Sequence, residues 1–173
     1  MKCNRLVDAG RRQFLRGGLG ATAGAAASVV MGTSEAKAQA ALARVDYPAN
    51  RLANVADLAV NEAMDVAYPD ADSPGVLLKL GQAIEGGVGP DGDIVAFSIL
   101  CPHKGWYLSY NGEDRTFNCP GHHSRFDAEA GGQQVWGHAT NNLPQFVLRV
   151  DDAGDIYAEG VDELIYGRLS NTL

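Results

Sequence analysis

The sequence predicts an all-β domain, built as an antiparallel sandwich or barrel. Turn signals of glycine, proline, asparagine and aspartate interrupt the chain at intervals of roughly eight to twelve residues. Short runs rich in β-branched and aromatic residues lie between these turns, as strands require. Helical periodicity is poor, and the regular alternation of strands and helices that builds a doubly wound nucleotide-binding sheet is absent.

The expected strands follow one another between these turns. Asn111 and Gly112 form a strong signal for a tight turn that joins two of them. Residues 155–159 alternate between polar and apolar side chains, as a half-buried strand does. The one stretch with some helical periodicity is residues 161–169. The expected strands are residues 64–68, 76–80, 94–100, 106–110, 116–119, 146–150 and 156–159.

Residues 1–38 have the organisation of an export signal. Six basic side chains against two acidic ones give this segment a positive charge, and residues 17–34 carry no charge. Residues 36–38 resemble a small-residue cleavage site. The alternative is an uncleaved membrane anchor, but five of the eighteen uncharged residues are glycine and few are strongly apolar. A cleaved signal is therefore the expectation.

Arg11 and Arg12, followed by Gln-Phe-Leu-Arg, resemble the twin-arginine export motif, which is read by a receptor. Such a signal implies a periplasmic protein that is exported already folded, often with a cofactor in place. Residues 39–173 then form one mature domain of 135 residues. Any association of this domain with a membrane is expected to be peripheral at most.

The composition narrows the class of protein. With 46% hydrophobic and 20% charged residues, the 173-residue chain is typical of a globular domain, and its net charge of −7 argues against a nucleic-acid partner. Cys3 lies in the predicted signal, so the mature chain keeps only Cys101 and Cys119. Two cysteines are too few for a disulfide scaffold, so the core, a metal centre or a partner must hold the domain.

All four histidines and both mature cysteines lie between Cys101 and His138. Cys101 and His103 form one group with Cys-x-His spacing. Cys119 and His122 form a second group with Cys-x2-His spacing, and fifteen residues separate the two groups. Each group offers one thiolate and one imidazole at the end of an expected strand, and such ligands indicate a metal centre.

Several kinds of site use cysteine and histidine. A structural zinc site usually pairs Cys with Cys and His with His along the sequence. A disulfide between Cys101 and Cys119 is compatible with export but leaves the histidine spacing unexplained. A blue-copper site takes one cysteine and two histidines, and a Cys–His nucleophile needs only one pair. A Rieske [2Fe–2S] centre uses both pairs, because two histidines replace two cysteines on one iron.

The two groups resemble the Rieske motif, Cys-x-His-x-Gly followed by Cys-Pro-x-His-x-Ser. The resemblance implies a Rieske-type β-sandwich or barrel with a cluster-binding subdomain at about residues 100–144. Two thiolates and two neutral imidazoles would leave the oxidised cluster uncharged, which favours reduction. Rieske potentials lie at about −150 to +300 mV, against about −400 mV for plant-type clusters with four thiolates. The matching residues are Cys101, His103, Gly105, Cys119, Pro120, His122 and Ser124.

The resemblance also implies roles for two neighbours of the cluster. The hydroxyl of Ser124 is expected to donate a hydrogen bond to a bridging sulfide and so to stabilise the reduced state; the alternative is that it only satisfies a turn. High-potential Rieske proteins place a tyrosine two residues later, where this chain has Phe126, which has no donor. We therefore expect a potential below that of the respiratory type, but positive or near zero.

The loops depart from those of most respiratory Rieske proteins. The positions of their loop-linking disulfide hold Trp106 and Gly121 here, so packing is expected to hold the loops together. His123 is expected at the surface, with a role at a docking face as the other option. His138 lies in residues 137–144, a segment similar to the loop that covers the cluster, so it is expected to cover rather than to ligate.

Within the Rieske superfamily, residues 39–173 resemble the small subunit of arsenite oxidase, most closely at residues 101–105, 119–127 and 139–145. The resemblance implies an electron-transfer subunit paired with a large subunit that carries molybdopterin and a [3Fe–4S] cluster and oxidises arsenite. Electrons would leave through this chain to a cytochrome c or azurin-like acceptor. The alternative is the Rieske subunit of a cytochrome bc-type quinol-oxidising complex.

Overall fold

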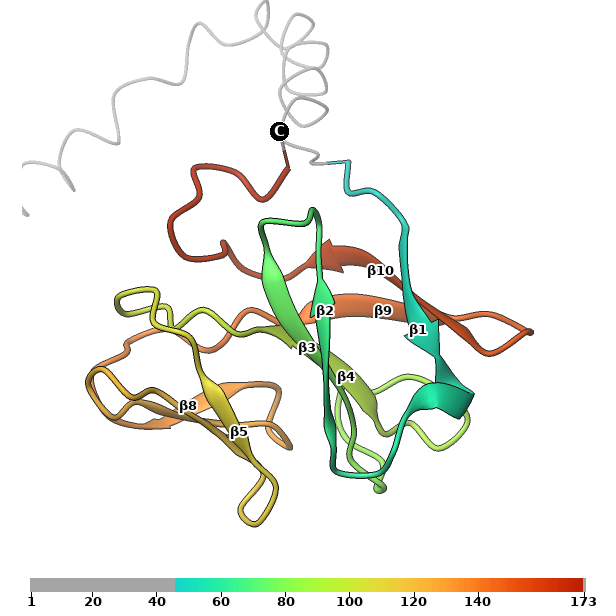
Figure 1. Cartoon of the computed structure of the whole chain (residues 1–173), viewed down its shortest axis with the longest axis horizontal. Helices are drawn as coiled ribbons and strands as arrows, with labels where there is room; N and C mark the ends of the chain where they lie inside the picture. The colour runs from blue at the N-terminus through green and yellow to red at the C-terminus, as the bar shows by residue number, and fades with distance from the viewer. Residues whose placement is uncertain (1–45, 173) are drawn as a thin grey trace, which may run out of the picture. The chain divides into compact units, whose positions relative to one another are not determined.

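The computed structural model describes residues 46–172, and the three sheets in this part of the chain are all antiparallel (Figure 1). Their strand orders are β1-β10-β9, β2-β3-β4 and β5-β6-β7-β8, which confirms the predicted all-β fold. The elements are β1 (Asn50–Asn54), the 3-10 helix η2 (Val55–Asp57), β2 (Ala63–Ala67), β3 (Pro74–Lys79), β4 (Ile94–Ser98), β5 (Ser109–Asn111), β6 (Thr116–Asn118), β7 (Arg125–Asp127), β8 (Gln133–Trp136), β9 (Phe146–Val150) and β10 (Asp155–Val161).

The first two sheets pack on a shared apolar core. This core contains Leu77 and Ile94 from β3 and β4, and Phe146 and Ile156 from β9 and β10. Gly75 in β3 allows the close approach, because a Cβ there would lie 2.6 Å from Cε2 of Phe146. Burial of these large apolar side chains supplies most of the stabilisation of this part of the fold.

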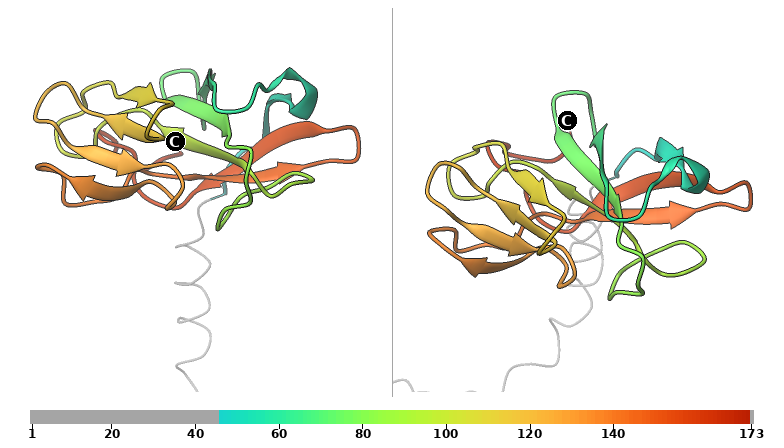
Figure 2. Two further views of the ribbon diagram at one scale, coloured as in Figure 1. Left: turned by 90° about the horizontal axis from the view of Figure 1, so that it is seen from below. Right: turned by 60° about the horizontal axis from the view of Figure 1, so that its bottom comes forward.

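The four-stranded sheet lies beside the other two, as both views of Figure 2 show. Its strands follow β4 and precede β9 in the chain. Ser98, at the end of β4, donates its backbone N–H to Pro144 O at 2.9 Å, so the segment that leads into this sheet is hydrogen-bonded to the segment that leads from it to β9. Its core contains Phe117, whose ring centroid lies 5.5 Å from that of Phe97 in β4 and 5.2 Å from that of Tyr110 in β5. The sheet is thereby anchored to the larger part of the fold.

Because neighbouring strands of this sheet run in opposite directions, its connections fall at two ends. Residues 112–115 and 128–132 connect strands at one end, which we call the turn end. Residues 101–108, 119–124 and 137–144 meet at the other, which we call the loop end. Cys101, Cys119 and all four histidines lie at the loop end.

Six of the seven expected strands are confirmed with small shifts of their bounds, and residues 146–150 match β9 in full. The strand expected at residues 106–110 is correct only in part, because Trp106 closes a loop, Tyr107 forms only an isolated bridge with Leu100, and the strand β5 begins at Ser109. Strands β1, β7 and β8 were not predicted. Strands β7 and β8 are short and have exposed or mixed faces without a clear period. Strand β1 has five residues, of which only Ala53 is buried.

Residues 161–169 form no helix; β10 ends at Val161 and turns follow. The side chain of Asn171 holds this segment, since its Oδ1 accepts from Ile165 N–H at 2.9 Å and its Nδ2 donates to Glu163 O at 2.8 Å. The turn signalled by Asn111 does join two strands, but it spans residues 112–115, and its positive φ of 52° belongs to Arg115.

The expected export signal, residues 1–38, lies outside the described residues. Within residues 46–172 there is no helix with the length and apolar character that crossing a membrane requires.

Candidate metal centre

The two predicted ligand loops repeat one hydrogen-bonding pattern. In the first loop, Cys101 N–H donates to Trp106 O at 2.9 Å and Gly105 N–H donates to Cys101 O at 2.7 Å. In the second, Cys119 N–H donates to the carbonyl five residues later at 2.9 Å, and His123 N–H donates back to Cys119 O at 3.1 Å. Each cysteine is therefore fixed at the start of a closed five-residue turn that holds its backbone rigidly.

Each loop turns at a residue with positive φ, four positions after its cysteine. These residues are Gly105, with a φ of 68°, and His123, with a φ of 60°. Gly105 is further constrained because a Cβ there would overlap the ring of Tyr166. His123 is a non-glycine residue in the left-handed region, which is uncommon and costs local strain. His123 therefore shapes the second loop through its backbone conformation and does not need to bind metal to do so.

The structure brings the four predicted ligands together at the loop end. Cys101 and Cys119 are both buried and both free, so they do not form the disulfide weighed as an alternative. The rings of His103 and His122 lie next to each other, with their centroids 4.8 Å apart at an interplanar angle of 73°. The two thiols lie on the inside and the two imidazoles nearer the surface, and thiolate and imidazole are the ligand types of a Rieske two-iron site.

The ionisation of these groups also follows from their surroundings. Burial raises the pKa of the Cys101 thiol, the backbone N–H of His103 lowers it, and the neighbouring Cys119 thiol raises it again. Burial and the nearby His122 lower the pKa of His103. This lowering of the pKa favours the neutral imidazole of His103, which is the form that coordinates metal.

A two-iron cluster fits the residues that are present. Nδ1 of His103 is buried and has no hydrogen-bond partner, so this donor nitrogen is left for a metal. Within residues 46–172, no three or more His, Cys, Asp or Glu side chains are arranged around a single ion. A [2Fe–2S] cluster takes two protein ligands on each iron, so two pairs, rather than one group of three or four, are what it requires.

Ser124 and Phe126 lie directly behind the second loop, and both side chains are fully buried. The hydroxyl Oγ of Ser124 accepts the backbone N–H of Ala139 at 2.9 Å. Phe126 belongs to the same apolar cluster as Cys101 and Cys119. Its ring therefore excludes water from the thiols without offering them a hydrogen bond.

The third loop, residues 137–144, closes over this site. The ring centroid of His138 lies 6.0 Å from that of His103 and 6.1 Å from that of His122. A pocket of 580 Å³ opens beside these rings and is lined by His122, His123, Gln134, Trp136, Gly137 and His138. His138 thus lies next to the two candidate ligands but outside the pairs, as a covering residue would.

The surface around the loop end is aromatic and carries few charges. Trp106, Tyr107 and Trp136 are 52%, 63% and 68% exposed. Between residues 100 and 144 the acidic residues are Glu113, Asp114, Asp127 and Glu129, all close to the turn end. The exposed lysine Lys104 follows His103. Of the seven lysines and arginines in residues 46–172, it is the one without an ion pair.

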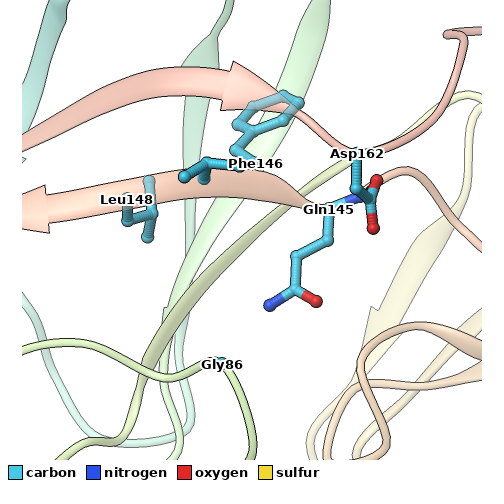
Figure 3. A pocket seen from close by; sticks show the side chains of 6 residues that line it. Gly86, Gln145, Phe146, Leu148 and Asp162 are labelled. Atoms are coloured by element: carbon cyan, nitrogen blue, oxygen red, sulfur yellow. The ribbon is translucent and has the colours of Figure 1, made fainter.

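A second, smaller pocket of 240 Å³ lies beside β9 (Figure 3). Its lining includes Gly86, Phe146 and Leu148, and the side chain of Gln145 extends toward Gly86. Asp162 accepts the backbone N–H of Gln145 at 2.7 Å, and burial raises the pKa of this carboxyl. None of these residues is a candidate ligand, so the pocket is separate from the metal centre.

Sequence reasoning missed two parts of this site. Gly137 packs on the backbone of the second loop, and Ala139 supplies the N–H that reaches Ser124. A glycine between Trp136 and His138 is a weak signal of close packing. The donor at Ala139 is a backbone group, so no residue type could have indicated it.

Comparisons with known proteins agree with this geometry. The family described as Rieske [2Fe-2S] domain matches residues 51–147. The chain is 40% identical over 166 residues to iodate reductase subunit IdrB of Denitromonas iodatirespirans, covering 93% of this chain and 85% of that protein. The same subunit of Pseudomonas sp. (strain SCT) is 41% identical over 160 residues, covering 91% of this chain and 81% of that protein.

Two further similarities are more limited: one covers a smaller part of this chain, and the other is a similarity of structure. The cytochrome bc1 complex Rieske iron-sulfur subunit of Corynebacterium efficiens is 40% identical over only 70 residues, covering 40% of this chain and 17% of that protein. The soluble domain of the Rieske protein II (soxF) from Sulfolobus acidocaldarius superposes with a TM-score of 0.63 at 26% identity, covering 73% of this chain and 85% of that one. This chain therefore belongs to the Rieske [2Fe-2S] family, and its cofactor is a Rieske [2Fe–2S] cluster.

Proposed function

We propose that this chain is the electron-transfer subunit of a periplasmic molybdopterin oxidoreductase of the arsenite oxidase type. We further propose that Cys101, His103, Cys119 and His122 are its cluster ligands. The observation that carries the assignment is the buried, unpartnered Nδ1 of His103, in a ring 4.8 Å from that of His122 and on the same loop as the free thiol of Cys101. When bound, the cluster accepts and releases one electron at a time.

The chain's own residues set the conditions for that transfer. The two thiolates contribute negative charge, while the neutral imidazoles contribute none, so the ligand set favours the acceptance of an electron more than four thiolates would. The hydroxyl of Ser124 is placed to donate to a sulfide and to stabilise the reduced form. Phe126 keeps water from the buried cysteines. Because the histidines lie nearer the surface than the cysteines, the electrons exchanged with the large subunit pass on the imidazole side.

The surface at the loop end supports a permanent protein partner. Stable subunit interfaces are rich in aromatic residues and depleted of charge in their centres. The exposed rings of Trp106, Tyr107 and Trp136 supply the aromatic residues, and the acidic residues of 100–144 lie close to the turn end instead. In the proposed complex the large molybdopterin subunit, with its [3Fe–4S] cluster, covers this face. The two electrons of arsenite leave that subunit singly through this chain to a cytochrome c or azurin-like acceptor.

A second candidate is an iodate reductase, favoured by the 40–41% identity to iodate reductase subunits over more than 90% of this chain. In that case electrons flow the opposite way, from a donor through this chain to a large subunit that reduces iodate. The quinol-oxidising alternative has weaker support, because its similarity covers 40% of this chain.

The test uses the protein purified from its native host with whatever large subunit accompanies it. We expect a molybdenum-containing partner and arsenite-dependent reduction of a dye. Iodate-dependent oxidation of a reduced dye, without arsenite activity, would transfer the assignment to the second candidate. A fully active Rieske protein isolated alone and without molybdenum would contradict both. Mass spectrometry of the mature N-terminus tests the proposed signal, since a peptide starting near Met1 in the periplasmic protein refutes cleavage.

A further inference from the structure

The side chain of Ser124 is oriented by a single backbone donor. Its Oγ accepts the N–H of Ala139 at 2.9 Å, and the side chain is fully buried. That bond occupies a lone pair of the hydroxyl oxygen and leaves the hydroxyl's own proton to be donated elsewhere. A buried hydroxyl proton needs an acceptor, and under the proposed function a sulfide of the cluster supplies one.

The donor at Ala139 reaches Ser124 because the chain passes unusually close to the second loop at Gly137. Gly137 has a φ of 94°, and a Cβ on it would lie 2.5 Å from Ser124 Cα. The same Cβ would lie 2.7 Å from His123 O and 2.7 Å from Ser124 N. These neighbours are all backbone atoms, so no flexible side chain can move aside. Any larger residue must push the two loops apart.

We propose that Gly137 is the positioning residue for the Ser124 hydroxyl. The absence of a side chain at Gly137 lets the third loop lie against the second, which brings the Ala139 N–H to Oγ and directs the hydroxyl proton toward the cluster. Gly137 acts through Ser124 and is not itself a donor to the cluster. The inference rests on the role proposed above for Ser124, and it extends that role to a residue in another loop.

The consequence is measurable as a reduction potential. In Gly137→Ala the third loop moves outward, the Ala139 N–H no longer holds Oγ, and the hydroxyl proton loses its fixed direction. The reduced form is then less well stabilised, so the potential falls. Because the effect passes through one hydroxyl, it cannot exceed that of Ser124→Ala, which removes the hydroxyl altogether.

The experiment measures the potential of the full-length, cluster-loaded chain by protein-film voltammetry. It compares wild type, Ser124→Ala, Gly137→Ala and the double variant. The matched control is Gly167→Ala, since Gly167 also has a positive φ, 83°, but a Cβ there meets nothing within 4 Å. We expect a lower potential in Gly137→Ala, the wild-type value in Gly167→Ala, and a double variant identical to Ser124→Ala.

The outcomes separate this inference from the one on which it rests. An unchanged potential in Ser124→Ala refutes the serine hydrogen bond itself. If Ser124→Ala lowers the potential, a wild-type value in Gly137→Ala overturns the inference, as does a shift that adds in full to that of Ser124→Ala. If Gly137→Ala loads no cluster, Ala139→Pro, which deletes the donor N–H, carries the same test, and a wild-type potential in that variant overturns the inference.

Discussion

The indole ring of Trp106 lies directly against the backbone of Gly121, so that a Cβ at Gly121 would be 3.0 Å from ring atoms Cδ1 and Nε1. Trp106 closes the first ligand loop and Gly121 lies within the second. These are the positions that, by resemblance, carry a loop-linking disulfide in most respiratory Rieske proteins. In this chain a ring packed on a glycine couples the two loops instead, in agreement with the prediction that packing must do so.

Trp106→Ala is expected to loosen this coupling. Truncation of a fully buried tryptophan costs about 3–5 kcal/mol, and since Trp106 is half exposed we expect about 1–2 kcal/mol. The measurements are thermal unfolding followed by cluster absorbance and the rate of iron loss to a chelator. Trp136→Ala, at a more exposed tryptophan of the same face, is the control. Equal rates of iron loss in the two variants would show that the contact with Gly121 does not hold the loops.

Phe126→Tyr is expected to raise the reduction potential. Phe126 is fully buried in the cluster of side chains that includes both cysteines, and a hydroxyl there could donate to a cysteine sulfur. A hydrogen bond to a charged group contributes about 1.5–3 kcal/mol, and only the part gained on reduction raises the potential, so for a one-electron couple the rise stays below about 60–130 mV. Voltammetry measures the shift. The control is Phe117→Tyr at a second buried phenylalanine of that cluster; a similar rise there would mean that polarity in general, rather than a bond to sulfur, sets the potential.

The sequence was most informative where chemistry depends on residue type and spacing. The two Cys–His pairs could be read directly, because few sites use one thiolate and one imidazole from each of two loops. Features that depend on backbone conformation could not be read from the sequence. The left-handed conformation at His123 repeats that of Gly105 in the first loop, yet a histidine gives only a weak signal of positive φ. The short strands β7 and β8 form because β7 pairs with β6 and β8 pairs with β7, and their three or four residues are too few to show a period.

His122→Ala is expected to abolish the Rieske EPR signal and electron delivery, because one iron loses a ligand. The appropriate control is His123→Ala, since His123 is the adjacent exposed histidine, and its backbone rather than its ring is what the second loop uses. That variant should keep the signal. An intact signal in His122→Ala would remove His122 from the ligand set, and loss of the signal in both variants would point to collapse of the loop instead.

Lys104→Glu is expected to weaken association with the large subunit. Lys104 stands beside His103, and within residues 46–172 no acidic side chain pairs with it, so its charge is available to a carboxylate of the partner. Exposed ion pairs contribute about 0.2–1 kcal/mol, and a reversal that replaces attraction with repulsion should lower affinity by roughly three- to tenfold. Titration of the large subunit with the variant at low and high salt measures the effect, which must shrink as salt screens it.

The control variant is Lys79→Glu. It changes the net charge equally, but Lys79 pairs with Asp91 at 3.6 Å and lies on β3. A loss of affinity of the same size in both variants would show that net charge, and not this position, governs docking.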